Sequence, residues 1–127
     1  MIWNGKEKRR FPRKKALIGV DILKIDNKKL PYKFDQEIGR NIGLGGICIE
    51  LSKKLPVSTE LWMELLIDKN LPPIKAKGKV IWIKEYIRPA SVIGGIKVKE
   101  RKNFIMGVEF LEITESDKKR INRFVTS

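Results

Sequence analysis

IKAKGKVIW, residues 74–82, carries the clearest period-two pattern of the chain. Apolar residues or glycine occupy every second position, and Lys75, Lys77 and Lys79 stand between them. Successive side chains of a β-strand point to opposite faces, so this pattern predicts a strand with one buried face. We extend this strand to residue 84 and expect Trp82 in the core, with a platform for stacking as the alternative.

The segments around this strand predict further strands. Runs rich in branched, aromatic and other apolar residues, bounded by turn residues, occupy 16–25, 32–38, 47–51, 60–67 and 104–113. The run 60–67 is almost entirely apolar, so a short helix is an alternative for it, and Trp62 within it is expected in the core. Residues 85–102 contain turn signals and could form a hairpin, which would be an insertion available to a partner.

The end of the chain predicts a helix. Thr114 fits the N-cap position, and Asp117 fits the third helical position of a capping-box-like pair. Ile121, Phe124 and Val125 form one apolar stripe, which needs a sheet or barrel to cover. Many short strands followed by one helix indicate a mainly β fold, a small antiparallel barrel with a C-terminal α-helix.

The N-terminal segment KEKRRFPRKK, residues 6–15, holds seven basic residues and one acid. Pro12 excludes a continuous helix. We therefore expect residues 1–15 to be a flexible basic arm and residues 16–127 to be the barrel domain. Its arginines are permanently charged planar groups suited to phosphates and guanine edges, although a solvated basic tail is the alternative.

Composition limits the functional classes. The net charge of +13 over 127 residues indicates an anionic partner: a nucleotide, a nucleic acid or a membrane surface. Histidine is absent, and the one cysteine, Cys48, has no metal-ligand spacing around it and is expected to be buried. No apolar run reaches the roughly 20 residues of a membrane span. We expect a cytoplasmic protein that is not an enzyme.

The segment RNIGLGG, residues 40–46, is a second candidate site. It lacks the lysine and hydroxyl residue of a P-loop, and no βαβ unit surrounds it. Its glycines indicate positive φ angles or a close backbone approach. Asn41 could offer an amide side chain to a ligand there.

Four short motifs together resemble the PilZ domain family over about residues 6–125. They are Arg9-xxx-Arg13, Asn41-x-Gly43-x-x-Gly46, the strand around 80–82, and Gly107-Val108-Glu109-Phe110 before a helix. The resemblance implies a six-stranded antiparallel barrel with a C-terminal helix, acting as a bacterial receptor for the second messenger cyclic di-GMP. It also implies ligand contacts from Arg9, Arg10, Arg13, Asn41, Gly43 and Gly46.

The chain departs from the family pattern at Gly43, where the motif has a serine whose hydroxyl lies at the ligand. Loss of one neutral hydrogen bond weakens binding about three- to tenfold. The resemblance favours an arm that orders on the nucleotide and changes a contact with a protein partner. Two alternatives stay open: a protein-interaction module without nucleotide, and a nucleic-acid-binding barrel, for which few stacking aromatics are available.

Overall fold

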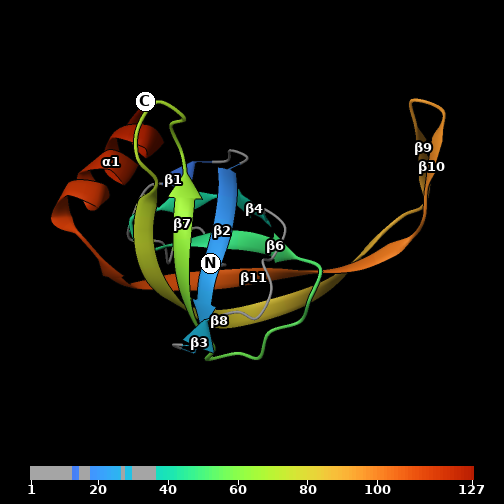
Figure 1. Ribbon diagram of the computed structural model, residues 1–127, viewed down its shortest axis with the longest axis horizontal. Helices are drawn as coiled ribbons and strands as arrows, with labels where there is room; N and C mark the ends of the chain where they lie inside the picture. The colour runs from blue at the N-terminus through green and yellow to red at the C-terminus, as the bar shows by residue number, and fades with distance from the viewer. Residues whose placement is uncertain (1–12, 15–17, 27, 30–36) are drawn as a thin grey trace, which may run out of the picture.

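The computed structural model describes residues 13–14, 18–26, 28–29 and 37–127. Figure 1 shows a barrel with the helix on one side and a long two-stranded ribbon leaving it on the other. The elements in chain order are β1 (Arg13–Lys14), β2 (Ile18–Ile25), β3 (Lys28–Lys29), β4 (Glu37–Arg40), β5 (Ile42–Gly43), β6 (Gly46–Leu51), β7 (Glu60–Leu66), β8 (Ile74–Arg88), β9 (Ser91–Ile93), β10 (Ile96–Val98), β11 (Arg101–Ile113) and α1 (Glu115–Thr126).

Six strands close into an antiparallel barrel. Their order is β2-β4-β6-β11-β8-β7, and β7 pairs back onto β2 to complete the circle. Closure removes the free sheet edges that would otherwise invite pairing with other chains. The predicted fold class, a six-stranded antiparallel barrel with a C-terminal helix, is confirmed.

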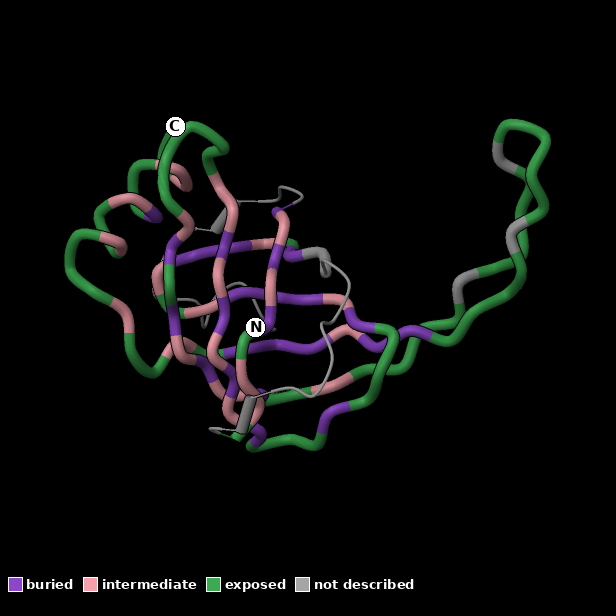
Figure 2. Tube along the Cα trace, viewed as in Figure 1, coloured by how far each residue is buried: buried purple, intermediate pink, exposed green. Residues whose placement is uncertain are grey.

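Alternating aliphatic side chains fill the barrel. In β7, Leu61, Met63 and Leu65 are fully buried, while the residues between them are half-buried. This period of two excludes the short helix that the sequence allowed for this segment. Figure 2 shows the buried positions concentrated on the barrel strands. Cys48 is buried as predicted, but it lies on the outer face of β6 between the core residues Ile47 and Ile49.

A β-bulge in β8 decides which way Trp82 points. Gly107 pairs with Trp82, but the next residue of β11 pairs with Val80, so Ile81 is the extra residue. A bulge shifts the alternation of side chains by one position. Ile83 consequently packs against the core, while Trp82 is 43% exposed. The prediction that Trp82 lies in the core is wrong for this reason.

Trp62 also lies outside the core, half-buried on the outer face of β7. Lys77 pairs with it from the neighbouring strand and places its ammonium 5.7 Å from the indole ring centre. The same ammonium forms ion pairs with Glu60 at 3.2 Å and Glu112 at 3.5 Å. Hydrogen bonding to Glu60 raises the pKa of Lys77 above its ordinary value. A cation and its carboxylates therefore cover this tryptophan, which was predicted in the core.

Helix α1 covers one part of the barrel, as the sequence predicts. The Thr114 side chain accepts a hydrogen bond from the Asp117 amide at 3.1 Å, which caps the first turn. Ile121 is fully buried, and Phe124 and Val125 pack against the core beside it. No helix in the described part of the chain is long and apolar enough to cross a membrane.

The ribbon consists of the far ends of β8 and β11 with a hairpin at its tip. The two long strands stay paired out to Arg88 and Arg101, and β9 then pairs with β10. Gly94 and Gly95 connect β9 to β10 with φ angles of +57° and +79°. Two consecutive positive φ angles are typical of a tight hairpin turn. The hairpin predicted within residues 85–102 is thereby confirmed.

Candidate ligand-binding site

A short strand pairing joins the N-terminal segment to the glycine-containing motif. β1 pairs antiparallel with β5, so that Arg13 lies opposite Gly43 and Lys14 opposite Ile42. Directly opposed residues of an antiparallel pair have Cα atoms about 4.5–5.5 Å apart. Two motifs separated by thirty positions in the sequence therefore meet at one place. Apart from Arg13 and Lys14, the predicted arm, with Arg9 and Arg10, lies outside the described residues.

Asn41 turns the chain between β4 and β5. Its φ is +48°, in the left-handed region that asparagine tolerates better than most residues. The sequence suggested that glycines of the 43–46 segment would have this conformation. Among the glycines that the structure describes, positive φ angles occur instead at Gly94 and Gly95, in the ribbon. The left-handed backbone conformation within this segment therefore belongs to Asn41.

Gly46 is a position of close backbone approach, the other possibility that the sequence left open. A Cβ added there would overlap the Val108 carbonyl oxygen and would lie 3.2 Å from the Glu109 Cα. Next to it, the Phe110 amide donates a hydrogen bond to the Gly45 carbonyl at 2.9 Å. The absence of a side chain at Gly46 therefore allows the backbone of β11 to pack directly against the motif. The predicted contact of Gly46 with a ligand stays a prediction.

Gly43 is buried and extended within β5. Its backbone takes part in the pairing with Arg13, which places it at the junction of the two motifs. An extended φ is accessible to any residue, so a serine here would meet no conformational penalty of the kind found at left-handed positions.

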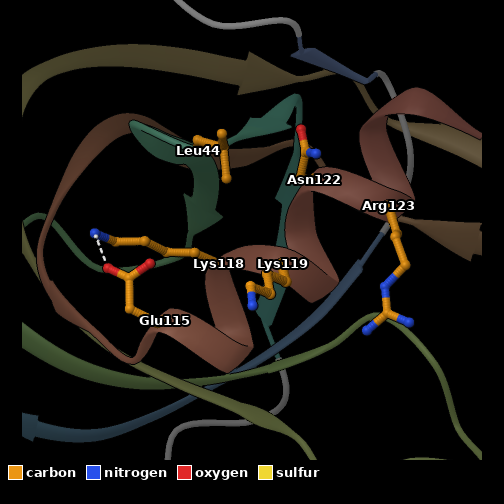
Figure 3. Close-up of a pocket in the computed structure, with 6 residues that line it drawn as sticks. All are labelled: Leu44, Glu115, Lys118, Lys119, Asn122 and Arg123. Carbon is orange, nitrogen blue, oxygen red and sulfur yellow. Dashed lines mark hydrogen bonds and ion pairs between the residues drawn. The ribbon is translucent and has the colours of Figure 1, made fainter.

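Helix α1 forms the opposite side of the site and contacts both β1 and β5. Between the helix and the motif lies an open cleft of about 780 Å³, within the range of roughly 300–1,000 Å³ typical of small-molecule sites. Figure 3 shows Leu44 on the motif side and five lining residues on the helix. The cleft is lined by Leu44, Glu115, Lys118, Lys119, Asn122 and Arg123.

The helical side of the cleft is mostly cationic. Lys118 forms an ion pair with Glu115 at 3.2 Å. Neither Lys119 nor Arg123 has an ion-pair partner among the residues that the structure describes. Two cations are therefore available to an anion in the cleft. The candidate site expected from the sequence did not include these two residues, although their spacing of four positions on a helix places them on one face.

Arg40, directly before Asn41, is held on the outer face of the barrel. Its guanidinium forms an ion pair with Glu50 at 2.8 Å. The other carboxylate oxygen of Glu50 accepts a hydrogen bond from the Asn103 amide at 2.9 Å. These contacts bridge β4, β6 and β11 and support the strand that leads into the motif.

The chemistry of the site is that of anion binding. Within the described ranges, no three residues among histidine, cysteine, aspartate and glutamate cluster as metal ligands would. The side chains available at the cleft are lysines, an arginine and an amide, which suit charge-assisted hydrogen bonds to phosphate. This donor set fits a phosphate-bearing ligand.

Comparison with known proteins agrees with this geometry. The PilZ domain family profile matches residues 7–127, which include residues 7–15 of the predicted arm, the barrel and the helix. The chain belongs to the PilZ domain family. In this PilZ domain, β1 carries the end of the arginine motif and β5 carries part of the glycine motif. The pairing of β1 with β5 therefore brings together two of the motifs by which the sequence resembles the family. A search of curated proteins found no match.

Two solved structures share the fold of this PilZ domain. One is the PilZ domain of YcgR from Escherichia coli with c-di-GMP, with a TM-score of 0.64 and 16% identity, covering 94% of this chain and 89% of that one. The other is the inhibitor of motility MotI/DgrA from Bacillus subtilis, with a TM-score of 0.62 and 16% identity. That match covers 94% of this chain, which spans 50% of the MotI/DgrA chain. At these identities the likeness establishes the fold.

Proposed function

We propose that this PilZ domain is a bacterial, cytoplasmic receptor for cyclic di-GMP that has no catalytic activity of its own. The observation that carries the proposal is the pairing of Arg13 with Gly43, which unites the arginine motif and the glycine motif. The similar YcgR structure contains c-di-GMP, which supports the choice of ligand.

The charges around the motif support a ligand with two phosphates. Arg13 lies in β1 opposite Gly43, while α1 carries Lys119 and Arg123, which have no ion-pair partner among the described residues. Cyclic di-GMP carries two negative phosphodiesters and two guanines, and arginine can bind both kinds of group. In the proposed complex, Arg9, Arg10 and Arg13 grip phosphate and guanine, and Asn41 offers its amide to the ligand.

Trp82 offers an aromatic surface on the same outer face of the barrel. Its indole lies across Gly107, because a Cβ at that glycine would overlap the ring. Gly107 pairs with Cys48, and Cys48 pairs with Arg40, beside the motif. In the proposed complex, one guanine of the ligand bound at the motif extends along this row of paired residues and stacks on the exposed indole of Trp82.

The output of the receptor is proposed to be a changed contact with a protein partner. An arm that closes over the ligand loses conformational entropy and presents a new surface, which makes it a switch. The MotI/DgrA protein, which shares the fold, is described as an inhibitor of motility, and this supports a regulatory role of the same kind.

Isothermal titration of cyclic di-GMP against wild type, Arg13→Ala and Lys28→Ala tests the proposal. Loss of one charge-assisted contact removes about 1.5–3 kcal/mol, so Arg13→Ala should bind about tenfold more weakly or worse. Lys28→Ala removes the same charge in β3, which pairs with the end of β2 remote from the motif. It should bind as wild type does.

Two results would contradict the proposal. If wild type binds no cyclic di-GMP, the receptor proposal is wrong, and the protein-interaction module and the nucleic-acid-binding barrel stay as the alternatives. If Arg13→Ala and Lys28→Ala lose affinity equally, the N-terminal segment acts as a diffuse cationic tail and the assigned site is wrong.

A further inference from the structure

The ribbon is the part of the molecule that the proposed receptor site does not use. Every residue from 84 to 102 whose burial the structure describes is exposed. Burial begins again at Asn103, where β11 enters the barrel. None of the described side chains of this double strand belongs to the core, which is consistent with a role outside the barrel.

The tip of the ribbon is uncharged. PASVIGGI, residues 89–96, contains no charged side chain. Val92 and Ile96 are 67% and 69% exposed, the highest values among the exposed large apolar residues. Apolar surface held this far from a core is a feature of interaction sites.

The apolar side chains of the tip lie on both of its faces. Lys97 pairs directly with Val92, and Ile96 pairs with Ile93. Paired residues share a face and successive residues alternate, so Val92 and Ile96 point to opposite sides. A flat protein surface would cover one of them and leave the other in water. An environment that surrounds the tip would bury both.

The stem behind the tip is basic. Between residues 84 and 102 there are six basic and two acidic residues, all outside the uncharged tip. One acid, Glu85, is already paired with Lys102 at 3.6 Å. Five of the basic residues belong to the stem, Lys84, Arg88, Lys99, Arg101 and Lys102, and the sixth, Lys97, lies opposite Val92 at the edge of the uncharged tip. The ribbon therefore changes along its length from apolar at the tip to cationic at the stem.

We propose that the ribbon binds anionic membrane surfaces, with its tip inserted to the depth of the acyl chains and its stem against the negative charges of the lipid headgroups. A bilayer interface has this sequence of environments along its normal: apolar at acyl-chain depth and negatively charged at the headgroups. It also surrounds an inserted tip on all sides, which matches the placement of Val92 and Ile96 on opposite faces. This activity is independent of the proposed nucleotide site.

Co-sedimentation of the whole chain with vesicles tests this inference without cyclic di-GMP. Wild type should bind vesicles of phosphatidylcholine with phosphatidylserine, bind pure phosphatidylcholine weakly, and lose binding as salt is raised. V92S/I96S removes two apolar side chains that touch no core, so it should keep its melting temperature and bind about tenfold more weakly or worse.

V57S/L71S is the matched control. Val57 and Leu71 are each 51% exposed and lie in loops of the barrel, away from the ribbon. This double variant should bind the anionic vesicles as wild type does. Equal loss in both double variants would overturn the inference, because it would show that any exposed aliphatic residue contributes.

Two other outcomes would also overturn it. Wild type that fails to bind the anionic vesicles excludes the membrane as the occupant. V92S/I96S that binds vesicles normally but loses binding to duplex DNA would assign the ribbon to nucleic acid instead.

Discussion

Gly46→Ala tests whether this glycine is required by packing even when no ligand is present. The new Cβ would overlap the Val108 carbonyl oxygen and would lie 3.1 Å from the carbonyl carbon. Both are backbone atoms, so no side-chain rotation can relieve the contact, and β6 and β11 must move apart by about 1 Å. We therefore expect Gly46→Ala to lower the melting temperature of the protein without ligand.

The magnitude follows from the cost of overpacking, about 1–3 kcal/mol. Unfolding entropy is about 2.1 cal/mol/K per residue, which for 127 residues gives about 0.27 kcal/mol/K. The clash should therefore lower the melting temperature by about 4–11 °C. Replacing glycine by alanine also restricts the unfolded chain, which stabilises by about 0.4–1 kcal/mol.

Gly45→Ala is the control that cancels this unfolded-state effect. Gly45 is exposed, and positive φ angles among the described glycines are confined to Gly94 and Gly95. Thermal unfolding followed by circular dichroism should place Gly46→Ala about 4–11 °C below Gly45→Ala. Equal melting temperatures would refute the packing argument and leave ligand contact as the reason for glycine at position 46.

Two further predictions concern the ligand. Gly43→Ser restores the hydroxyl of the family motif on an extended backbone, so it should tighten cyclic di-GMP binding about three- to tenfold in isothermal titration; unchanged or weaker binding would show that the hydroxyl has no partner here. Saturating cyclic di-GMP should slow amide hydrogen exchange across residues 6–15, because charge-assisted contacts order the segment; identical exchange with and without ligand would contradict the proposed switch.

Local patterns in the sequence were sufficient to predict the fold class, the C-terminal helix and most barrel strands. They left residues 60–67 open between strand and helix, and most of the predicted strand 32–38 lies outside the described residues. The alternation of residues 74–80 and the cap at Thr114 are properties of neighbouring residues, so they can be read without a structure. The family motifs likewise identified Arg13, Asn41, Gly43 and Gly46 as one candidate site before any contact between them was known.

Features that depend on the pairing of two distant segments could not be predicted from local sequence patterns. The extra residue Ile81 exists only relative to the partner strand β11, and it turns Trp82 from the core to the outer face. Position 46 requires glycine because a side chain there would overlap the carbonyl oxygen of Val108, which lies sixty-two positions later in the chain. Register is a property of a pair of strands, and a single strand does not contain it.

The sequence by itself determined the alternation that makes the strands, the helix with its cap, and the positive charge that predicts an anionic partner. The tertiary structure decided which segments of the chain meet. The pairing of β1 with β5 places Arg13 opposite Gly43 in the sheet, and α1, which carries Lys119 and Arg123, contacts both strands. The physical reason is that barrel closure sets which distant segments become neighbours, and the strength of a charged site depends on those distances.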